Sequence, residues 1–302
     1  MNARHFLIPA FILLSACRQI EVETPAVPKE ENPEFVTGTL TLRATRGDSD
    51  TKGLDLTNGG ATLNAYWKDT DQVKVYKAGS FLGTLGVTPA AGEKPRVATI
   101  SGEIPTAGLV VGDILTLMIP RETWDYTGQR GVLTGTNSIE NTYDYAMATV
   151  SIASIYGNEI TTDGSASFQY QQSVYRFGFK SGGSYIDPKS FTITAASGKL
   201  VQQVSWDGSV WAPYYGPLIV TPEAAAGDHF YYVSLRNDNS SADDTYHFVI
   251  NGTDKALYFA SPTIPGTALD APGKFIGAKQ ISVSKPGFAP ASSSISSTED
   301  VY

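Results

Sequence analysis

From Phe35 onward, short runs of alternating or continuous apolar residues recur, and Gly, Pro, Asn or Asp usually separates them. β-branched and aromatic residues are frequent within these runs, a pattern typical of strands joined by tight turns. The predicted strands are 35–42, 73–76, 97–100, 113–119, 145–152, 174–179, 191–194, 218–220, 230–235, 246–250 and 275–283. With no long amphipathic helix pattern among them, the spacing predicts an all-β protein built of sandwiches rather than βαβ units.

Changes in composition predict where the domains begin and end. The segment Thr161–Ser165 is polar and turn-prone, and a new aromatic strand pattern starts at Phe168. We therefore expect an N-terminal β-sandwich over 35–165 and a C-terminal one over 166–289. Residues 17–34 interleave Glu with Pro, which favours an extended tether, and the serine-rich residues 290–302 are expected to form a flexible tail.

The N-terminus has the features of an export signal. Arg4 precedes an apolar stretch over 6–16, and the small residues Ser15 and Ala16 lead directly into Cys17. The stretch is too short to span a bilayer, so residues 1–16 are predicted to be a cleaved signal peptide. Leu-Ser-Ala-Cys is similar to the bacterial lipoprotein signal, which implies a lipid-modified Cys17 anchored in the outer membrane. The alternative is a plain secretory signal that contains a cysteine.

The overall charge limits the classes of partner. The 302 residues contain 22 Lys and Arg against 30 Asp and Glu, a net charge of −8. An acidic surface argues against nucleic acid as a partner, because binding the phosphate backbone requires clustered cations. Cys17 is the single cysteine, so no disulfide framework stabilises the fold and an ordinary hydrophobic core must do so.

Residues that could support catalysis or hold a metal are sparse. His229 and His247 both lie in strand patterns and do not form a zinc motif. No nucleophile elbow, phosphate-binding loop or dinucleotide fingerprint is present, so the chain is predicted not to be an enzyme and to need no cofactor or metal. Asp238, Asp243 and Asp244 could bind a hard cation, although a solvated hairpin loop is the simpler interpretation.

An aromatic cluster is the candidate ligand-binding site. Trp206 and Trp211 flank the turn signal Asp207-Gly208, and Tyr214 follows closely, so a hairpin tip is predicted here. Exposed rings at such a tip could stack on a sugar face. The alternative is that the rings pack beneath the loop as part of the core.

Several stretches together resemble one protein family. They are 67–76 (WKDTDQVKVY), 98–102 (ATISG), 112–120 (GDILTLMIP), 126–129 (YTGQ), 144–148 (DYAMA), Phe168 with 172–174 (QSV), and 272–275 (PGKF). Their order resembles the fimbrillin family of Bacteroidetes surface lipoproteins, the subunits of type V pili. The resemblance implies two tandem transthyretin-like β-sandwiches of Greek-key type. It also implies export as a lipoprotein, removal of the first strand by an arginine-specific protease, and polymerisation by strand addition from a neighbouring subunit.

The first predicted strand carries the residues that this scheme requires. Val36, Leu40 and Leu42 share one face of 35–42, and Arg43 and Arg46 follow before the polar loop Gly47–Gly53. Because proteolysis concentrates at exposed polar loops, cleavage is expected after Arg46, with Arg43 as the second choice. Both arginines could instead be ordinary solvated charges. The donor strand is expected to be 275–283 or the tail beyond Pro286.

Two functions remain in contention from the sequence. The first is a structural or adhesive pilus subunit at the cell surface, whose partners are other pilus subunits and whose position as stalk, tip or anchor is open. The second is a surface lipoprotein that binds glycans through Trp206, Trp211 and Tyr214.

Overall fold

Strands provide nearly all of the regular structure in the computed structural model, which confirms the all-β prediction. The described residues are 37–46, 66–92, 95–119, 123–207, 209–239, 242–266, 273 and 275–286. Cys17, the tether, the loop Gly47–Gly53 and the tail 290–302 lie outside them. Over the described ranges, none of the helical structure is long and apolar enough to cross a membrane.

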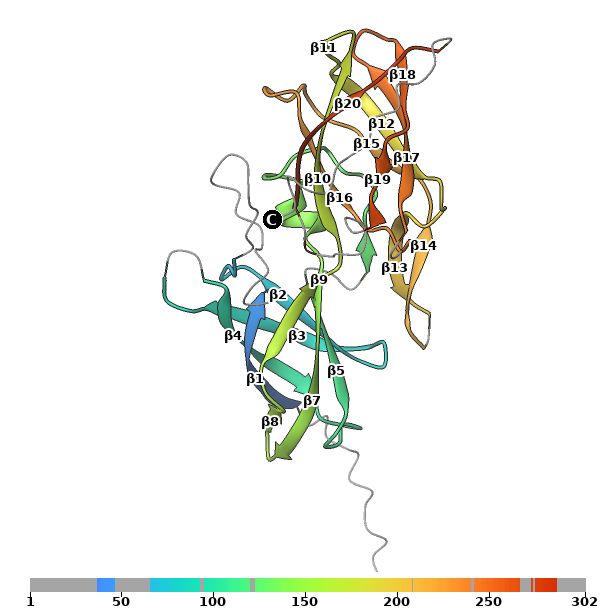
Figure 1. The fold of residues 1–302 in the computed structure, drawn as a ribbon. Coiled ribbons are helices and arrows are strands. Elements are labelled where there is room, and N and C mark those ends of the chain that lie inside the picture. Colours follow the sequence, from blue (N-terminus) through green and yellow to red (C-terminus); the bar gives the residue numbers. More distant parts are fainter. Residues whose placement is uncertain are drawn as a thin grey trace, which may run out of the picture. The chain divides into compact units, whose positions relative to one another are not determined.

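The N-terminal half forms one large sheet, in the spatial order β4-β3-β2-β5-β7-β8-β1-β9 (Figure 1). Its strands are β1 (Thr37–Arg46), β2 (Gln72–Lys77), β3 (Ser80–Pro89), β4 (Val97–Pro105), β5 (Ile114–Ile119), β7 (Ala146–Tyr156), β8 (Glu159–Thr162) and β9 (Ala166–Tyr170). β1 pairs with β4 as well as with β8 and β9, so the hydrogen-bonded ladder closes on itself.

The remaining strands, all but β6 from the C-terminal half, form smaller sheets. One joins β10 (Ser173–Ser181) to β11 (Ser184–Tyr185), β16 (Tyr231–Leu235) and β20 (Phe275–Ser282). A second joins β12 (Pro188–Ala195), β15 (Leu218–Val220), β17 (Asp244–Gly252) and β18 (Leu257–Ala260), with β19 (Thr263–Ile264) paired to β17. A third joins β6 (Trp124–Asp125), β13 (Val201–Trp206) and β14 (Trp211–Tyr215). Every predicted strand overlaps an observed one.

The first strand is longer than the pattern predicts. It runs from Thr37 to Arg46 rather than ending at Leu42, and residues 35–36 lie outside the described ranges. Its residues alternate strictly, with Leu40, Leu42 and Ala44 buried and the intervening residues largely facing outward. The alternation of buried and exposed residues continues past Leu42 through Ala44 and Thr45. It is hard to see in the sequence because the charged residues Arg43 and Arg46 flank these two positions.

Two large apolar clusters form the core. The N-terminal cluster lies within the closed sheet and includes Leu40, Leu42, Phe168 and Trp67. The C-terminal cluster combines strands after residue 173 with Trp124, Tyr126 and Tyr145, which come from much earlier in the chain. In addition, β9 hydrogen-bonds to β1 and β7 of the N-terminal sheet. The division after residue 165 stays a prediction. These contacts show that some residues before 165 pack in the C-terminal cluster and that β9, after 165, belongs to the N-terminal sheet.

Replacing a side chain on the inner face of β1 tests its contribution to the core. Leu40 is fully buried, so Leu40→Ala should lower the free energy of unfolding by about 2–5 kcal/mol. Thr39→Ala, on the exposed face of the same strand, is the matched control and should change it by less than about 0.5 kcal/mol. Urea unfolding curves of the two variants provide the measurement. Equal losses would contradict the observed orientation of β1.

Candidate functional site

The end of β1 brings an arginine into the interior. Arg46 follows Leu40, Leu42 and Ala44 at two-residue intervals, so its side chain points to the same inner face and is 9% exposed. Arg43 lies on the opposite face and is exposed. The two arginines predicted as cleavage sites therefore have different environments. For Arg46, the alternative of an ordinary solvated charge does not apply.

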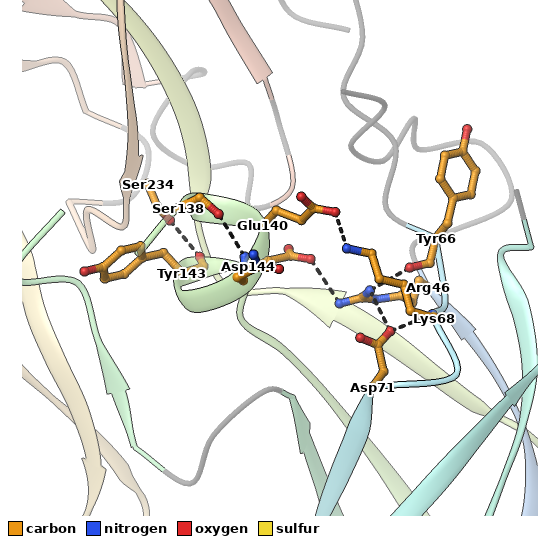
Figure 2. Close-up of polar contacts among 10 residues, drawn as sticks. Arg46, Tyr66, Lys68, Asp71, Ser138, Glu140, Tyr143, Asp144 and Ser234 are labelled. Carbon is orange, nitrogen blue, oxygen red and sulfur yellow. Dashed lines mark hydrogen bonds and ion pairs between the residues drawn. The ribbon is translucent and has the colours of Figure 1, made fainter. Parts of the chain in front are cut away.

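Four groups surround the Arg46 guanidinium, and Figure 2 shows Tyr66, Asp71 and Asp144 among them. Nη2 donates to Asp144 Oδ2 at 3.0 Å, and Nη1 donates to the Tyr66 carbonyl oxygen at 3.1 Å. Asp71 Oδ2 lies 3.6 Å from Nη1, and the Trp67 ring centroid lies 4.9 Å from the guanidinium carbon. A buried cation is tolerated when it is paired and hydrogen-bonded in this way.

Short-range structure positions the two carboxylates. Asp144 directly follows η1 (Ile139–Tyr143), a single π-helical turn whose first residue is preceded by Ser138, and the Ser138 side chain accepts a hydrogen bond from the Asn141 N–H. At the other end of η1, Ser234 Oγ donates to the Tyr143 carbonyl at 3.0 Å, which ties this turn to β16 (Figure 2). Asp144 is therefore held by elements other than β1.

Asp71 is fixed by a tight turn before β2. Its Oδ2 accepts the Lys68 backbone N–H at 2.9 Å, and its own N–H donates to the Lys68 carbonyl at 3.1 Å. The Lys68 ammonium is itself paired with Glu140 in η1. The Lys68–Glu140 pair lies beside the buried Arg46–Asp144 pair (Figure 2). The Lys68 ammonium therefore already has a carboxylate partner of its own.

The buried pair is electrostatically unequal. Burial raises the pKa of Asp144 above its ordinary value, and the Arg46 guanidinium opposes that shift. For Arg46, burial acts to lower the pKa, but Asp144, Tyr170 and Asp71 outweigh it and the pKa lies above its ordinary value. Within the described residues, Asp144 Oδ1 and Arg46 Nε are buried without hydrogen-bond partners. The charge of Asp144 therefore depends strongly on Arg46.

Removing the cation alone should be costly. Arg46→Gln leaves Asp144 buried and unpaired, so the free energy of unfolding should fall by about 3–5 kcal/mol at pH 7. The double variant Arg46→Gln/Asp144→Asn should recover part of that loss. Arg43→Gln removes the same charge from the exposed face and should have an effect below about 0.5 kcal/mol. Urea unfolding compares all three variants, and a loss for Arg43→Gln as large as for Arg46→Gln would contradict the assignment.

The defect of Arg46→Gln should depend on pH. Without the guanidinium, the pKa of Asp144 rises further, so the folded variant retains a proton that the unfolded chain releases. A raised folded-state pKa favours the folded state at low pH, and this contribution is lost as pH rises through it. The difference in unfolding free energy between wild type and variant should therefore shrink from pH 7 to about pH 4.5. A difference that stays constant or grows toward low pH would contradict an ionised, paired Asp144.

The aromatic hairpin has the predicted form. β13 and β14 pair with Trp206 opposite Trp211, and Asp207 Oδ1 accepts the N–H groups of Ser209 and Val210 at the tip. The Asp207 side chain therefore links the facing ends of β13 and β14, as expected for a hairpin. Gly208 lies outside the described residues.

Both tryptophans pack against other parts of the protein. Trp211 stacks on Trp124 at 6.3 Å and meets Tyr76 edge-on at 5.7 Å. Trp206 contacts Trp211 and also covers the turn between β2 and β3, where Gly79 has φ +77° and any Cβ would lie 2.0 Å from the Trp206 indole nitrogen. These contacts favour packing over an open sugar platform.

Tyr214 differs from the tryptophans because it is 66% exposed. Truncating it should leave the free energy of unfolding within about 0.5 kcal/mol of wild type, whereas Trp211→Ala should lower it by about 3 kcal/mol. Urea unfolding and retention on immobilised polysaccharides would be measured for both variants. Unchanged stability of Trp211→Ala, together with lost retention, would restore the glycan-binding hypothesis.

The remaining polar candidates are engaged in structural contacts. His229 Nδ1 lies 2.8 Å from Asp187 Oδ1, and His247 Nδ1 lies 2.9 Å from Ser261 Oγ. Asp238 accepts from the Arg236 guanidinium, and Asp244 accepts from Ser197. Among the residues that the structure describes, no cluster of three or more His, Cys, Asp or Glu is arranged to hold a metal ion.

Sequence reasoning did not identify the partners of Arg46. Trp67, Asp71 and Asp144 all occur in stretches that carry the family resemblance, but nothing in those stretches indicates that they meet one arginine. A signal is visible in hindsight, since a basic residue at an even interval after Leu40, Leu42 and Ala44 belongs on the buried face.

The chain matches no protein-family model and no curated protein. Solved structures similar to it include a proposed cell adhesion protein of Bacteroides ovatus, with 9% identity, a TM-score of 0.41 and coverage of 82% of this chain and 95% of that one. A fimbrial assembly protein of Parabacteroides distasonis has 10% identity, a TM-score of 0.38 and coverage of 81% and 90%. The tip fimbrial protein Mfa3 of Porphyromonas gingivalis, with a C-terminal truncation, has 11% identity, a TM-score of 0.36 and coverage of 83% and 96%. Because these TM-scores are below 0.5, the three structures carry no argument about the function of this chain.

Proposed function

We propose that this chain is a structural or adhesive subunit of a surface pilus. It is exported as a lipoprotein through Cys17, matured by cleavage at an arginine, and assembled with other pilus subunits by strand addition. It acts at the cell surface without catalysis, cofactor or metal. The observation that carries the proposal is the position of β1, which is bonded to neighbouring strands on both edges and ends in the arginine predicted for cleavage.

The placement of β1 supports a strand-addition mechanism. Thr37–Thr45 pairs antiparallel with Val97–Pro105 of β4, while the other edge pairs in parallel with β8 and β9. Leu40, Leu42 and Ala44 fill the core from this strand. Loss of β1 would therefore leave a strand-shaped groove with two hydrogen-bonding walls and an apolar floor, which another extended segment can occupy.

The environments of the two arginines bear on where cleavage occurs. A protease that recognises arginine must bind the side chain, and the Arg46 side chain is held by Asp144 and Tyr66. The Arg43 side chain is exposed, but its backbone is paired with Thr99 in the middle of β1. We keep Arg46 as the first choice because it is the last residue of β1. A cut there requires the Arg46–Asp144 pair to break and the end of the strand to open, but it leaves the ladder between Thr37–Thr45 and β4 paired.

The finer architecture belongs to the same proposal. We assign the two halves to tandem transthyretin-like sandwiches, as the family resemblance implies, with each apolar cluster as one core. As a donor, β20 would have to leave its own sheet, because it pairs in parallel with β10 and buries Ile281. The tail beyond Pro286 is the other donor candidate, and it lies outside the described residues.

Limited digestion of the soluble chain that begins after Cys17 tests the proposal. An arginine-specific protease should make one early cut, after Arg46 or Arg43, and denaturant-resistant oligomers should follow. The variants Arg46→Lys and Arg43→Lys keep the charge but remove the recognised residue, so one of them should block the early cut and the oligomers. Intact mass, N-terminal sequencing and gel electrophoresis give the readout.

Two results would contradict the proposal. The first is an intact chain after prolonged digestion under conditions that cleave an unfolded control. The second is a chain cut at the predicted position that stays monomeric and accepts no added strand.

A further inference from the structure

We propose that the groove occupied by β1 selects an incoming strand that carries a basic residue at the position of Arg46, where it pairs with Asp144. This inference rests on the proposed function, since it concerns the strand that replaces β1 after cleavage. The partner is an extended segment of a neighbouring subunit with small and apolar inward residues that ends in Arg or Lys. The tail 287–302 of this chain contains no Lys or Arg and does not meet that requirement.

The acidic end of the groove stays when β1 leaves. Asp144 is positioned by η1 and the start of β7, and Asp71 by its turn with Lys68. Arg46, in contrast, belongs to β1 and departs with it if the cut follows Arg46. The groove would then end in two carboxylates, and the ammonium of Lys68 is already paired with Glu140.

An uncompensated carboxylate at this position opposes filling by a neutral strand. The Asp144 side chain is 7% exposed, and its Oδ1 has no hydrogen-bond partner among the described residues even while Arg46 is in place. Covering it with an apolar or amide side chain would bury a charge without a cation, which is strongly unfavourable. A guanidinium or ammonium at the same position restores the ion pair with Asp144 Oδ2.

The rest of the inner face sets the spacing that a partner must match. A Cβ on Gly38 would lie 2.7 Å from Thr106 Cγ2 and 3.0 Å from Ile160 Cδ1, so the first inward position requires a very small residue. Leu40 and Leu42 then call for apolar side chains, and Ala44 calls for a small one. The basic residue follows two positions later. Because β4 is antiparallel and β8 and β9 are parallel to β1, the walls also fix the direction of the strand.

Peptides test this selectivity on the full chain. A cleavage site for an unrelated protease is introduced between residues 47 and 65, so that β1 is severed without relying on the native cut. The cut chain is unfolded in urea and refolded with an excess of ten-residue peptides competing for the groove. The reference peptide has the sequence of Thr37–Arg46, and native mass spectrometry quantifies which peptide is bound.

Matched peptides separate the buried charge from net charge. A peptide with Arg46→Gln should bind at least about 100-fold more weakly than the reference, whereas a peptide with Arg43→Gln loses the same charge from the outer face and should bind within about threefold. A peptide with Arg46→Lys should stay within about tenfold of the reference. In a cut chain carrying Asp144→Asn, the preference for Arg over Gln should fall below about tenfold.

The outcomes distinguish the inference from the function it rests on. Exchange of all peptides with equal preference overturns the basic-residue requirement and leaves strand addition intact. No exchange with any peptide, the reference included, argues against strand addition itself. Equal losses for the Arg43→Gln and Arg46→Gln peptides would show a net-charge effect and also overturn the inference. If the Asp144→Asn chain does not refold, the relative binding of the Arg46→Gln and Arg43→Gln peptides to the unaltered groove still tests the basic-residue requirement.

Discussion

The period of two in β1 forces a charge into the protein. Leu40, Leu42 and Ala44 face the core, and a strand without a bulge, such as β1 in its pairing with β4, keeps every second residue on the same face. Arg46 is therefore carried inside by the residues that precede it. Four groups stabilise its buried charge. They are the carboxylate of Asp144 after η1, the carboxylate of Asp71 in the turn before β2, the Tyr66 carbonyl and the Trp67 ring.

The Arg46–Asp144 pair contributes more to fixing the register of β1 than to the free energy of unfolding. A buried ion pair gains little over a well-packed apolar contact, because both charges lose their hydration. Here the geometry is also incomplete, since Arg46 Nε and Asp144 Oδ1 lack partners among the described residues. A strand shifted by two residues keeps its apolar face but places an uncharged side chain opposite Asp144, or leaves Arg46 away from it. The ion pair makes that shift unfavourable, which apolar contacts alone would not do.

Local pattern predicted the strands well and the site poorly. Every strand predicted from the apolar pattern overlaps an observed one, yet the pattern missed β3, which contains Gly83 and Gly86, and the short strands β6, β8, β11, β18 and β19. The hairpin between Trp206 and Trp211 followed from its turn residues, whereas the packing of both rings against distant elements did not. Arg46 and Asp144 are 98 positions apart, and no periodicity in either segment encodes their meeting. Contacts of that kind depend on how the sheet closes, which single-sequence patterns do not contain.

The two edges of β1 differ in how many residues are paired with a neighbouring strand. As a result, the contact that most opposes the release of β1 is the one made by Arg46. The edge toward β4 is paired along nearly the whole strand, but the parallel edge is paired at Thr39–Leu40 and Ala44–Arg46, with no ladder partner for Thr41–Arg43 among the described residues. Opening the parallel side thus disrupts few backbone bonds. The Arg46–Asp144 pair opposes opening at the end of the strand, because breaking it leaves the buried Asp144 carboxylate without its cation. The same contact therefore retains β1 before cleavage and, once β1 is gone, creates the electrostatic demand that a replacing strand has to meet.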